Sequence, residues 1–185
     1  IFTVDLYNHR IKEHQQKDLS FIRMKGTLGL SDSATSYHVP TGITCDESNC
    51  IVADEGNYRW TKIDVSSLGI IWQVTIDYNT IGDTSLDQDE NYVYGAYNKI
   101  SDQSVNHQEF VLEKRFKGNG ELVNRIIVKP EGSVSLSTYA MQGDIALRGR
   151  YVYITFTNSG VARDGTFYIQ KRLKTDFSLY LKKAD

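Results

Sequence analysis

The feature that most constrains the fold of this chain is an alternation of apolar and polar residues with a period of two. It is clearest in residues 151–157, where Val152, Ile154 and Phe156 alternate with tyrosine and threonine. A period of two places successive side chains on opposite faces of a β-strand, so each such segment buries one face. The pattern therefore predicts half-buried strands.

Short strands of this kind are separated by turn residues along the whole chain. Gly118-Asn119-Gly120 joins two apolar stretches, and glycine and asparagine tolerate the positive φ angles of a hairpin turn. About ten short strands joined by such turns are typical of an antiparallel sandwich and not of a parallel α/β sheet. Besides 151–157, the predicted strands are 2–6, 21–25, 61–65, 72–78, 92–97, 109–116, 122–129, 134–140, 166–173 and 177–182.

The length favours one domain over residues 1–185. A chain of 185 residues is long enough for one well-buried core, and we find no internal repeat or linker that would divide it. The only predicted helix runs from Asn8 to Leu19, with Asn8 as its N-cap. We therefore expect an all-β protein, a single antiparallel β-sandwich with at most one short helix near the N-terminus.

The charge balance argues against a nucleic-acid partner. The chain has 21 basic and 23 acidic residues and a net charge of −2. Nucleic-acid-binding proteins carry a basic excess, because neutralised phosphates supply much of their affinity. A transmembrane segment is not predicted either, since no stretch approaches the roughly 20 apolar residues that are required.

The two cysteines predict a secreted or cell-surface protein. Cys45 and Cys50 are separated by four polar residues, which suits a small disulfide-closed loop worth about 2 kcal/mol. Two free thiols or half of a zinc site are the alternatives, but zinc needs four ligands and there is no second cysteine pair. A disulfide indicates an oxidising compartment. A start at Ile1 agrees with a mature chain whose signal peptide has been removed.

An acidic run at 82–91 is the best candidate for a metal site. Oxygen ligands at alternate positions resemble the start of a calcium loop. An EF-hand is excluded, because Tyr92 and Asn98 stand where the loop glycine and the bidentate glutamate belong. The remaining alternatives are a calcium site of another kind and a solvated loop. Calcium is the one cofactor suggested, with these predicted ligands: Asp83, Asp87, Asp89 and Asn91.

Polar and aromatic residues gather near the cysteines in a region predicted as a long loop, 31–60. Loops on a rigid scaffold often carry binding function, and aromatic faces beside hydrogen-bonding groups suit sugars or protein anchors. For Trp60 the alternative is a buried core position at the start of a strand. The predicted ligand-binding residues are Tyr37, His38, Asn57, Tyr58, Arg59 and Trp60.

Residues 53–68 followed by 71–76 contain a Trp-bearing strand and then a Val-x-Ile strand, and residues 149–154 begin Gly-Arg-Tyr-Val. In this order the two segments resemble the discoidin (F5/8 type C) and fucolectin group, whose domains have the second motif late in the chain. The resemblance implies a galactose-binding-like jelly roll, extracellular, that binds glycans, lipid headgroups or proteins through loops at one end. Residues 77–83 lack the arginine of fucose-binding members, so no sugar-binding residue is carried over.

The expected function is recognition or adhesion, with a glycan or protein partner bound through loops at one end of the sandwich. No nucleophile motif or phosphate loop is present, so no catalytic residue is assigned and an enzyme is not expected. A structural domain of a larger surface, coat or fibre protein is the second interpretation, with homo-oligomerisation or a multidomain parent. The third is a glycoside hydrolase whose two carboxylates meet only in space.

Overall fold

The fold was analysed in a computed structural model, which describes residues 1–26, 36–76, 80–102, 107–128, 143–157 and 167–180. The chain divides into two compact units, Ile1–Tyr78 (unit 1) and Asn79–Asp185 (unit 2). Each unit contains two antiparallel sheets. The expectation of one domain over residues 1–185 stays a prediction.

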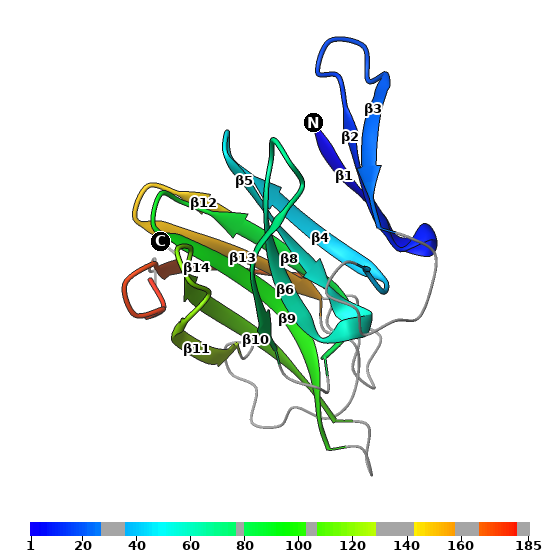
Figure 1. The fold of residues 1–185 in the computed structure, drawn as a ribbon. Helices are drawn as coiled ribbons and strands as arrows, with labels where there is room; N and C mark the ends of the chain where they lie inside the picture. The colour runs from blue at the N-terminus through cyan, green and yellow to red at the C-terminus, as the bar shows by residue number, and fades with distance from the viewer. Residues whose placement is uncertain (27–35, 77–79, 103–106, 129–142, 158–166, 181–185) are drawn as a thin grey trace. The chain divides into compact units, whose positions relative to one another are not determined.

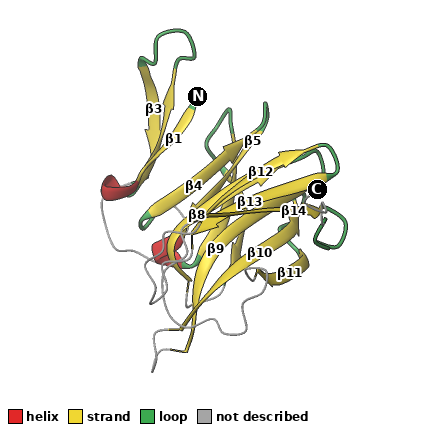
Figure 2. Cartoon of the chain, turned by 180° about the vertical axis from the view of Figure 1, so that it is seen from behind, coloured by secondary structure: helices red, strands yellow, loops and turns green. Residues whose placement is uncertain are grey.

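Unit 1 is built from two sheets whose strands follow one another in chain order. The first sheet has the order β1-β2-β3 and the second β4-β5-β6-β7, and each pair of neighbours is antiparallel. One turn of 3-10 helix follows β1 (η1, Leu6–Asn8) and another follows β5 (η2, Glu55–Asn57); Figure 2 shows both among the strands. The strands are β1 Phe2–Asp5, β2 Arg10–His14, β3 Phe21–Lys25, β4 Pro40–Cys45, β5 Asn49–Asp54, β6 Arg59–Asp64 and β7 Ile70–Thr75.

Unit 2 repeats this plan with longer strands (Figure 1). One sheet has the order β11-β10-β9-β8 and the other β12-β13-β14, again antiparallel throughout. A single β-bridge between Arg172 and Leu179 follows β14. The strands are β8 Thr80–Gln88, β9 Tyr92–Asp102, β10 His107–Phe116, β11 Leu122–Val128, β12 Gly143–Arg148, β13 Tyr151–Thr157 and β14 Phe167–Leu173.

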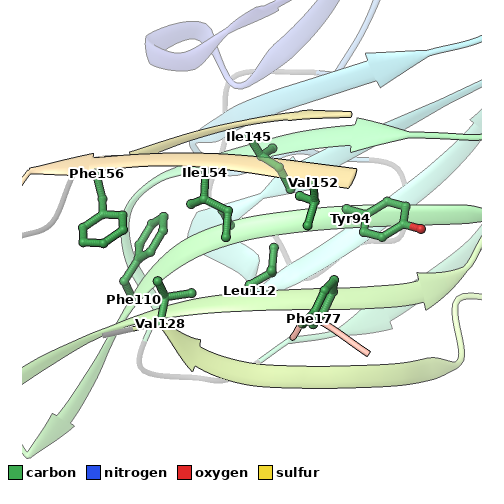
Figure 3. Packing of buried hydrophobic residues seen from close by; sticks show 10 residues of the cluster. Tyr94, Phe110, Leu112, Val128, Ile145, Val152, Ile154, Phe156 and Phe177 are labelled. Atoms are coloured by element: carbon green, nitrogen blue, oxygen red, sulfur yellow. The ribbon is translucent and has the colours of Figure 1, made fainter. Parts of the chain in front are cut away.

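The two sheets of unit 2 share one apolar core, which the alternating pattern of β13 creates. Val152, Ile154 and Phe156 are all 0% exposed, and Figure 3 shows them directed toward Phe110 and Leu112 on the facing sheet. The Phe110 and Phe156 rings lie 5.6 Å apart. Burial of these side chains stabilises the unit by about 1.5–3 kcal/mol each.

Unit 1 has a smaller core of its own. Ile11 on β2 is completely buried and lies in one cluster with Val52 and Ile63 of the neighbouring sheet. Partly buried residues of β1, Phe2 and Val4, pack against the same cluster. Each unit is therefore a pair of sheets around an apolar layer, and the predicted all-β, antiparallel, sandwich-like fold is confirmed.

The predicted helix from Asn8 to Leu19 is wrong. Only Leu6–Asn8 form a helical turn, and Arg10–His14 are strand β2, paired with β1 and β3. Polar residues and a single buried Ile11 suit a half-buried strand as well as they suit a polar helix, so the letters alone favoured neither. Across the described residues, neither helical turn has the length and apolar character of a membrane span.

Two predicted loops are also strands. The region 31–60 contains β4 and β5, and the acidic run 82–91 contains the end of β8. Strand β5 escaped notice because its central residues, Cys50–Ala53, are all buried and form a continuous apolar run without alternation. The predicted strand at 134–140 lies outside the described residues, and of 177–182 only the bridge at Leu179 is described as paired.

Candidate functional site

The predicted ligand-binding residues come together at one corner of unit 1, where β5 passes through η2 into β6. Asp54 ends β5 and is 0% exposed. Its φ and ψ angles, −100° and 78°, turn the chain out of the sheet direction and into the 3-10 turn. We call this set, Asp54 with the residues bound to it, the η2 corner.

Three donors converge on the Asp54 carboxylate. The amide of Asn57 and the guanidinium Nε of Arg59 each donate to Oδ2 at 2.8 Å, and the backbone N–H of His38 donates to Oδ1 at 2.6 Å. Arg59 also donates to the carbonyl of Ser36 at 2.5 Å. A buried carboxylate is tolerated only with such partners. The corner is therefore a closed ionic anchor that ties segment 36–38 to β5 and β6.

Burial dominates the electrostatics of this anchor. It raises the pKa of Asp54 above the ordinary value, while the bonds from Asn57, from the His38 amide and from Arg59 lower it. Burial likewise raises the pKa of the neighbouring Tyr37, and the Asp54 carboxylate adds to that shift. The shift moves the pKa of Tyr37 further from neutral pH, which suits a structural position and not proton transfer by this hydroxyl.

The turn itself depends on a close backbone approach at Gly56. Its N–H donates to the carbonyl of His38 at 2.8 Å, and a Cβ at this position would lie 2.7 Å from the same oxygen. Tyr58 then adopts a left-handed conformation with φ 49°, and its backbone N–H donates to the carbonyl of Glu55 at 2.8 Å. The side chain of Tyr58 remains partly exposed beside the anchor.

Two histidines lie next to the corner. The rings of His9 and His38 are 5.2 Å apart between centroids. His9 Nδ1 accepts the backbone N–H of Val39 at 3.0 Å. The pair links the end of η1 to the segment that precedes β4, and both rings are partly exposed.

The predicted residues divide into buried and surface positions. Trp60 is 0% exposed and Tyr37 is 2% exposed, so neither presents a ring to a ligand; Trp60 has the core position that was its alternative. The other four are partly exposed around the corner: His38, Asn57, Tyr58 and Arg59.

The η2 corner has a second copy at η1, so the expectation of no internal repeat is wrong. Asp5 accepts a hydrogen bond from the Asn8 amide at 2.8 Å and from Arg10 Nε at 3.0 Å, as Asp54 does from Asn57 and Arg59. His9, which follows Asn8, again has a left-handed backbone conformation, as Tyr58 does, with φ 53°. An Asp-x-x-Asn-x-Arg spacing, read at 5–10 and 54–59, is the signal that could have revealed the repeat.

The two copies differ in exposure. The side chain of Asp5 is 17% exposed and that of Asp54 is 0% exposed. Lys12 adds a further ion pair to Asp5 at 2.6 Å, and this hydrogen bond and that of Asn8 lower the pKa of Asp5. The same three residue types, Asp, Asn and Arg, form both corners. Their first role is therefore to build the corner.

The acidic residues predicted to bind calcium have protein partners. Asp87 accepts the backbone N–H of Leu147 at 2.7 Å, and Asp89 accepts the hydroxyl of Tyr94 and the ammonium of Lys174, both at 3.1 Å. Although burial raises the pKa of Asp89, the Lys174 bond brings it below the ordinary value.

The other two predicted ligands contribute little that can be described. Asn91 donates its backbone N–H to Asp89 at 3.2 Å, while Asp83 lies in β8 with its side chain outside the described residues. No cluster of three or more metal-ligand side chains occurs among the residues described. Calcium binding stays a prediction.

A buried charge cluster on β9–β11 was missed. Glu113 is 0% exposed and accepts hydrogen bonds from the Tyr97 hydroxyl at 2.8 Å and from Arg125 Nε at 2.7 Å. Arg115 Nε binds its other oxygen, and Arg115 also donates to Gly120 at 2.8 Å. A run of charged residues at 113–115 inside a strongly apolar strand was the signal that could have revealed this cluster. All the charges of the cluster are paired, as in the η2 corner.

The disulfide prediction is confirmed. Cys45 and Cys50 are bonded and are cross-strand neighbours at the ends of β4 and β5. The hairpin between them is closed by Asp46, whose carboxylate accepts the N–H groups of Ser48 and Asn49 at 2.8 and 2.7 Å.

Comparison with known proteins gives likenesses of structure only. No family model and no curated protein sequence matches the chain. A functionally unknown protein from Desulfotomaculum acetoxidans is similar with TM-score 0.55 and 11% identity, over 93% of this chain and 50% of that one. BamB from Moraxella catarrhalis has TM-score 0.50 and 10% identity, over 92% of this chain and 49% of its own. Hydrazine synthase from Kuenenia stuttgartiensis has TM-score 0.43 and 8% identity, over 97% and 64%.

These likenesses bear on the fold alone. At such identities the first two share an arrangement of strands with this chain, which spans about half of their length. None of the three is named as a discoidin-type protein, and that resemblance stays a prediction.

Proposed function

We propose that this protein is a non-catalytic recognition module of the extracellular space or cell surface, which binds a protein partner at the η1 and η2 corners. The observation that supports this is the pair of corners themselves. Each is fixed by an internal Asp-Asn-Arg set, and each leaves an aromatic or imidazole side chain at the surface beside that rigid anchor. Rigid aromatic groups next to buried anchors are what protein interfaces use as binding centres.

The polar side chains of the η2 corner favour recognition over catalysis. Asp54 and Arg59 bond each other, and Asn57 is bonded to the same carboxylate. A general acid or base needs a carboxyl that reaches a substrate, and a nucleophile needs such a base beside it. These side chains are bonded to one another, whereas sugar recognition requires side-chain polar groups that face the hydroxyls of the ligand. The corner therefore favours a protein partner over a glycan.

The most exposed aromatic residue at the corners is Tyr7 in η1, at 87%. A tyrosine with so little contact to its own chain contributes nothing to the core, and its ring offers apolar area with a hydroxyl at the tip. With His9, His38 and Tyr58 it forms the proposed contact surface. The Cys45–Cys50 disulfide supports the extracellular setting, because such bonds persist in oxidising compartments.

The proposal is tested with the labelled chain on an array of extracellular protein domains and, in parallel, on a glycan array. We expect saturable binding to a protein that is lost in Tyr7→Ala. The matched control is Phe21→Ala, an aromatic residue 56% exposed at the opposite end of the same sheet, and it should bind as the original chain does. Binding to glycans alone, competed by free sugar, would replace the proposed partner class, and silence on both arrays would reject recognition.

A further inference from the structure

The backbone of Val39 has a conformation that its residue type and its neighbour both disfavour. Its φ angle is 53°, in the left-handed region, and Pro40 follows it. A branched Cβ crowds the backbone in that region, and a following proline favours an extended conformation. Among the described residues with positive φ, Val39 is the only one with a branched Cβ. Such a conformation persists only where the surrounding structure holds it.

Three hydrogen bonds hold the chain at this point. The backbone N–H of His38 donates to Asp54 at 2.6 Å, and the carbonyl of His38 accepts the N–H of Gly56 at 2.8 Å. The N–H of Val39 itself donates to Nδ1 of His9 at 3.0 Å. The first two bonds belong to the η2 corner, whereas the third ties the segment to the residue between η1 and β2.

The bond to His9 exists only while its imidazole is neutral. A backbone N–H can only donate, so the ring nitrogen has to offer a lone pair. An imidazolium carries a proton on both nitrogens and has no lone pair to offer. Histidine is the side chain whose charge ordinarily changes between about pH 5 and 8. Mild acid therefore removes this bond.

His14, at the end of β2, makes the opposite kind of contact. Its Nδ1 lies 3.1 Å from the carbonyl oxygen of Leu19. A carbonyl can only accept, so this nitrogen donates, and it still donates when the ring is charged. One sheet thus contains a histidine whose contact requires the neutral ring and a histidine whose contact survives protonation.

The other charged groups of the surrounding elements are largely paired with one another. Asp5 is paired with Arg10 and Lys12, and Asp54 with Arg59. The ring of His38 lies 5.2 Å from that of His9 and repels it when both are charged. These groups are Asp5, Arg10, Lys12 and Lys25 of the first sheet and Asp54, Glu55 and Arg59 of the η2 corner.

We propose that the contact between His9 and Val39 is a pH-sensitive switch, which holds segment 36–39 against η1 at neutral pH and opens in mild acid. Opening lets the backbone of Val39 leave its disfavoured conformation and loosens the η2 corner through the adjacent His38. Because the folded state loses a bond when His9 is protonated, the contact weakens as the pH falls below about 6.5. The inference does not depend on the proposed function.

The opening is local, because the two sheets of unit 1 are also joined elsewhere. Arg23 on β3 donates to the carbonyl of Val65 at 2.5 Å. A guanidinium stays charged throughout the range in which histidine titrates, so this contact persists in mild acid. The two sheets therefore remain joined while the His9 contact opens.

The test is hydrogen exchange of the Val39 amide, followed by NMR in the intact chain at about pH 7 and about pH 5. The rate is expressed as a protection factor, which removes the intrinsic pH dependence of exchange. We expect the protection of Val39 to fall about fivefold or more in acid, as the loss of one ordinary hydrogen bond implies. Amides in the centre of β5 and β6 should keep their protection.

His9→Asn is the decisive variant. The asparagine carbonyl accepts an N–H at either pH, and asparagine tolerates the left-handed conformation of position 9, where φ is 53°. In this variant the protection of Val39 should no longer depend on pH. His14→Asn is the matched control and should keep the fivefold fall. Groups that titrate in every chain compared, Asp54 among them, cancel in the difference between the profiles.

Val39→Gly tests the role of the backbone conformation, and circular dichroism confirms that each variant is folded. Glycine adopts the left-handed conformation without a steric cost, so the His38 amide should keep its protection in acid in this variant and lose it in the unaltered chain. A Val39 amide with equal protection at both pH values in the unaltered chain would overturn the proposal. So would the same fall in His9→Asn, no fall in His14→Asn, or a parallel loss at every amide of unit 1.

Discussion

The two copies of the corner allow a direct measurement of what burial contributes to an ion pair. In Asp54→Ala the guanidinium of Arg59, 13% exposed, and the N–H of His38 lose their acceptor inside the protein. Removing one partner of a buried pair costs about 3–5 kcal/mol. In Asp5→Ala the side chains of Asn8, Arg10 and Lys12 lose their acceptor, but Arg10 and Lys12 are 28% exposed and water replaces the carboxylate. We expect about 1 kcal/mol or less for that change.

Urea unfolding followed by tryptophan fluorescence is the suitable assay. The chain has two tryptophans, Trp60 and Trp72, and both lie in unit 1 with the two corners. With a slope of roughly 2 kcal/mol per molar urea, Asp54→Ala should lower the unfolding midpoint by roughly 2 M. Asp5→Ala should lower it by about 0.5 M or less.

The pair of variants can contradict the reasoning in two ways. Equal losses for Asp54→Ala and Asp5→Ala would show that burial does not set the energy of this corner. A loss below about 1 kcal/mol for Asp54→Ala would show that the anchor is not needed for the fold. As a further control, the double variant Asp54→Ala with Arg59→Met should recover part of the loss, because the charge that Asp54→Ala leaves unpaired is then absent.

Other positions give sharp expectations of their own. Gly120→Ala should cost about 1–2 kcal/mol at φ 76°, whereas Leu19→Gly, at φ 59° and 62% exposed, should cost nothing or stabilise the chain; equal losses in urea unfolding would contradict this. Replacing Cys45 and Cys50 by serine should cost about 2 kcal/mol, and reduction should raise the intact mass by two hydrogens; an unchanged mass would exclude the disulfide. Hydrogen bonds from the two serines of its turn lower the pKa of Asp64 from 3.8 to about 2. Its stabilising effect is therefore complete above pH 3.8 and is lost as the pH falls toward 2, so Asp64→Asn should show a smaller acid-induced drop in thermal midpoint than the original chain; identical acid profiles would contradict it.

The alternating strands were the part of the fold that the sequence predicted well. In β13, Val152, Ile154 and Phe156 face the core as the period of two requires, because a residue's face is decided by its own position in the strand. The hairpin at 118–120 was equally local, since Gly120 adopts the positive φ that its residue type permits.

The strands that were missed depend on neighbours. Strand β5 is buried at every position from Cys50 to Asp54, so it carries no alternation, and β2 pairs on both sides with only Ile11 fully buried. Whether such segments become strands is decided by the strands beside them, which supply the hydrogen bonds and the apolar cover.

The candidate site shows the same division. Its residue types were identified from the letters, because histidine, asparagine and arginine beside tyrosine can form polar contacts wherever they meet. That Asp54 is their common acceptor could not be read from the chain, since the bond from His38 spans sixteen positions. A tryptophan at position 60 is likewise compatible with a core and with a binding surface. Its complete burial is a property of the packing alone.

The sequence by itself determined that the chain forms short antiparallel strands, where they turn, and which two cysteines join, because these depend on residues close together in the chain. The tertiary structure decided which carboxylates are buried and paired, that one corner recurs, and that Ile169 is exposed although it lies in a strand. Burial and pairing are relations between distant segments, and each is set by whichever surface lies opposite.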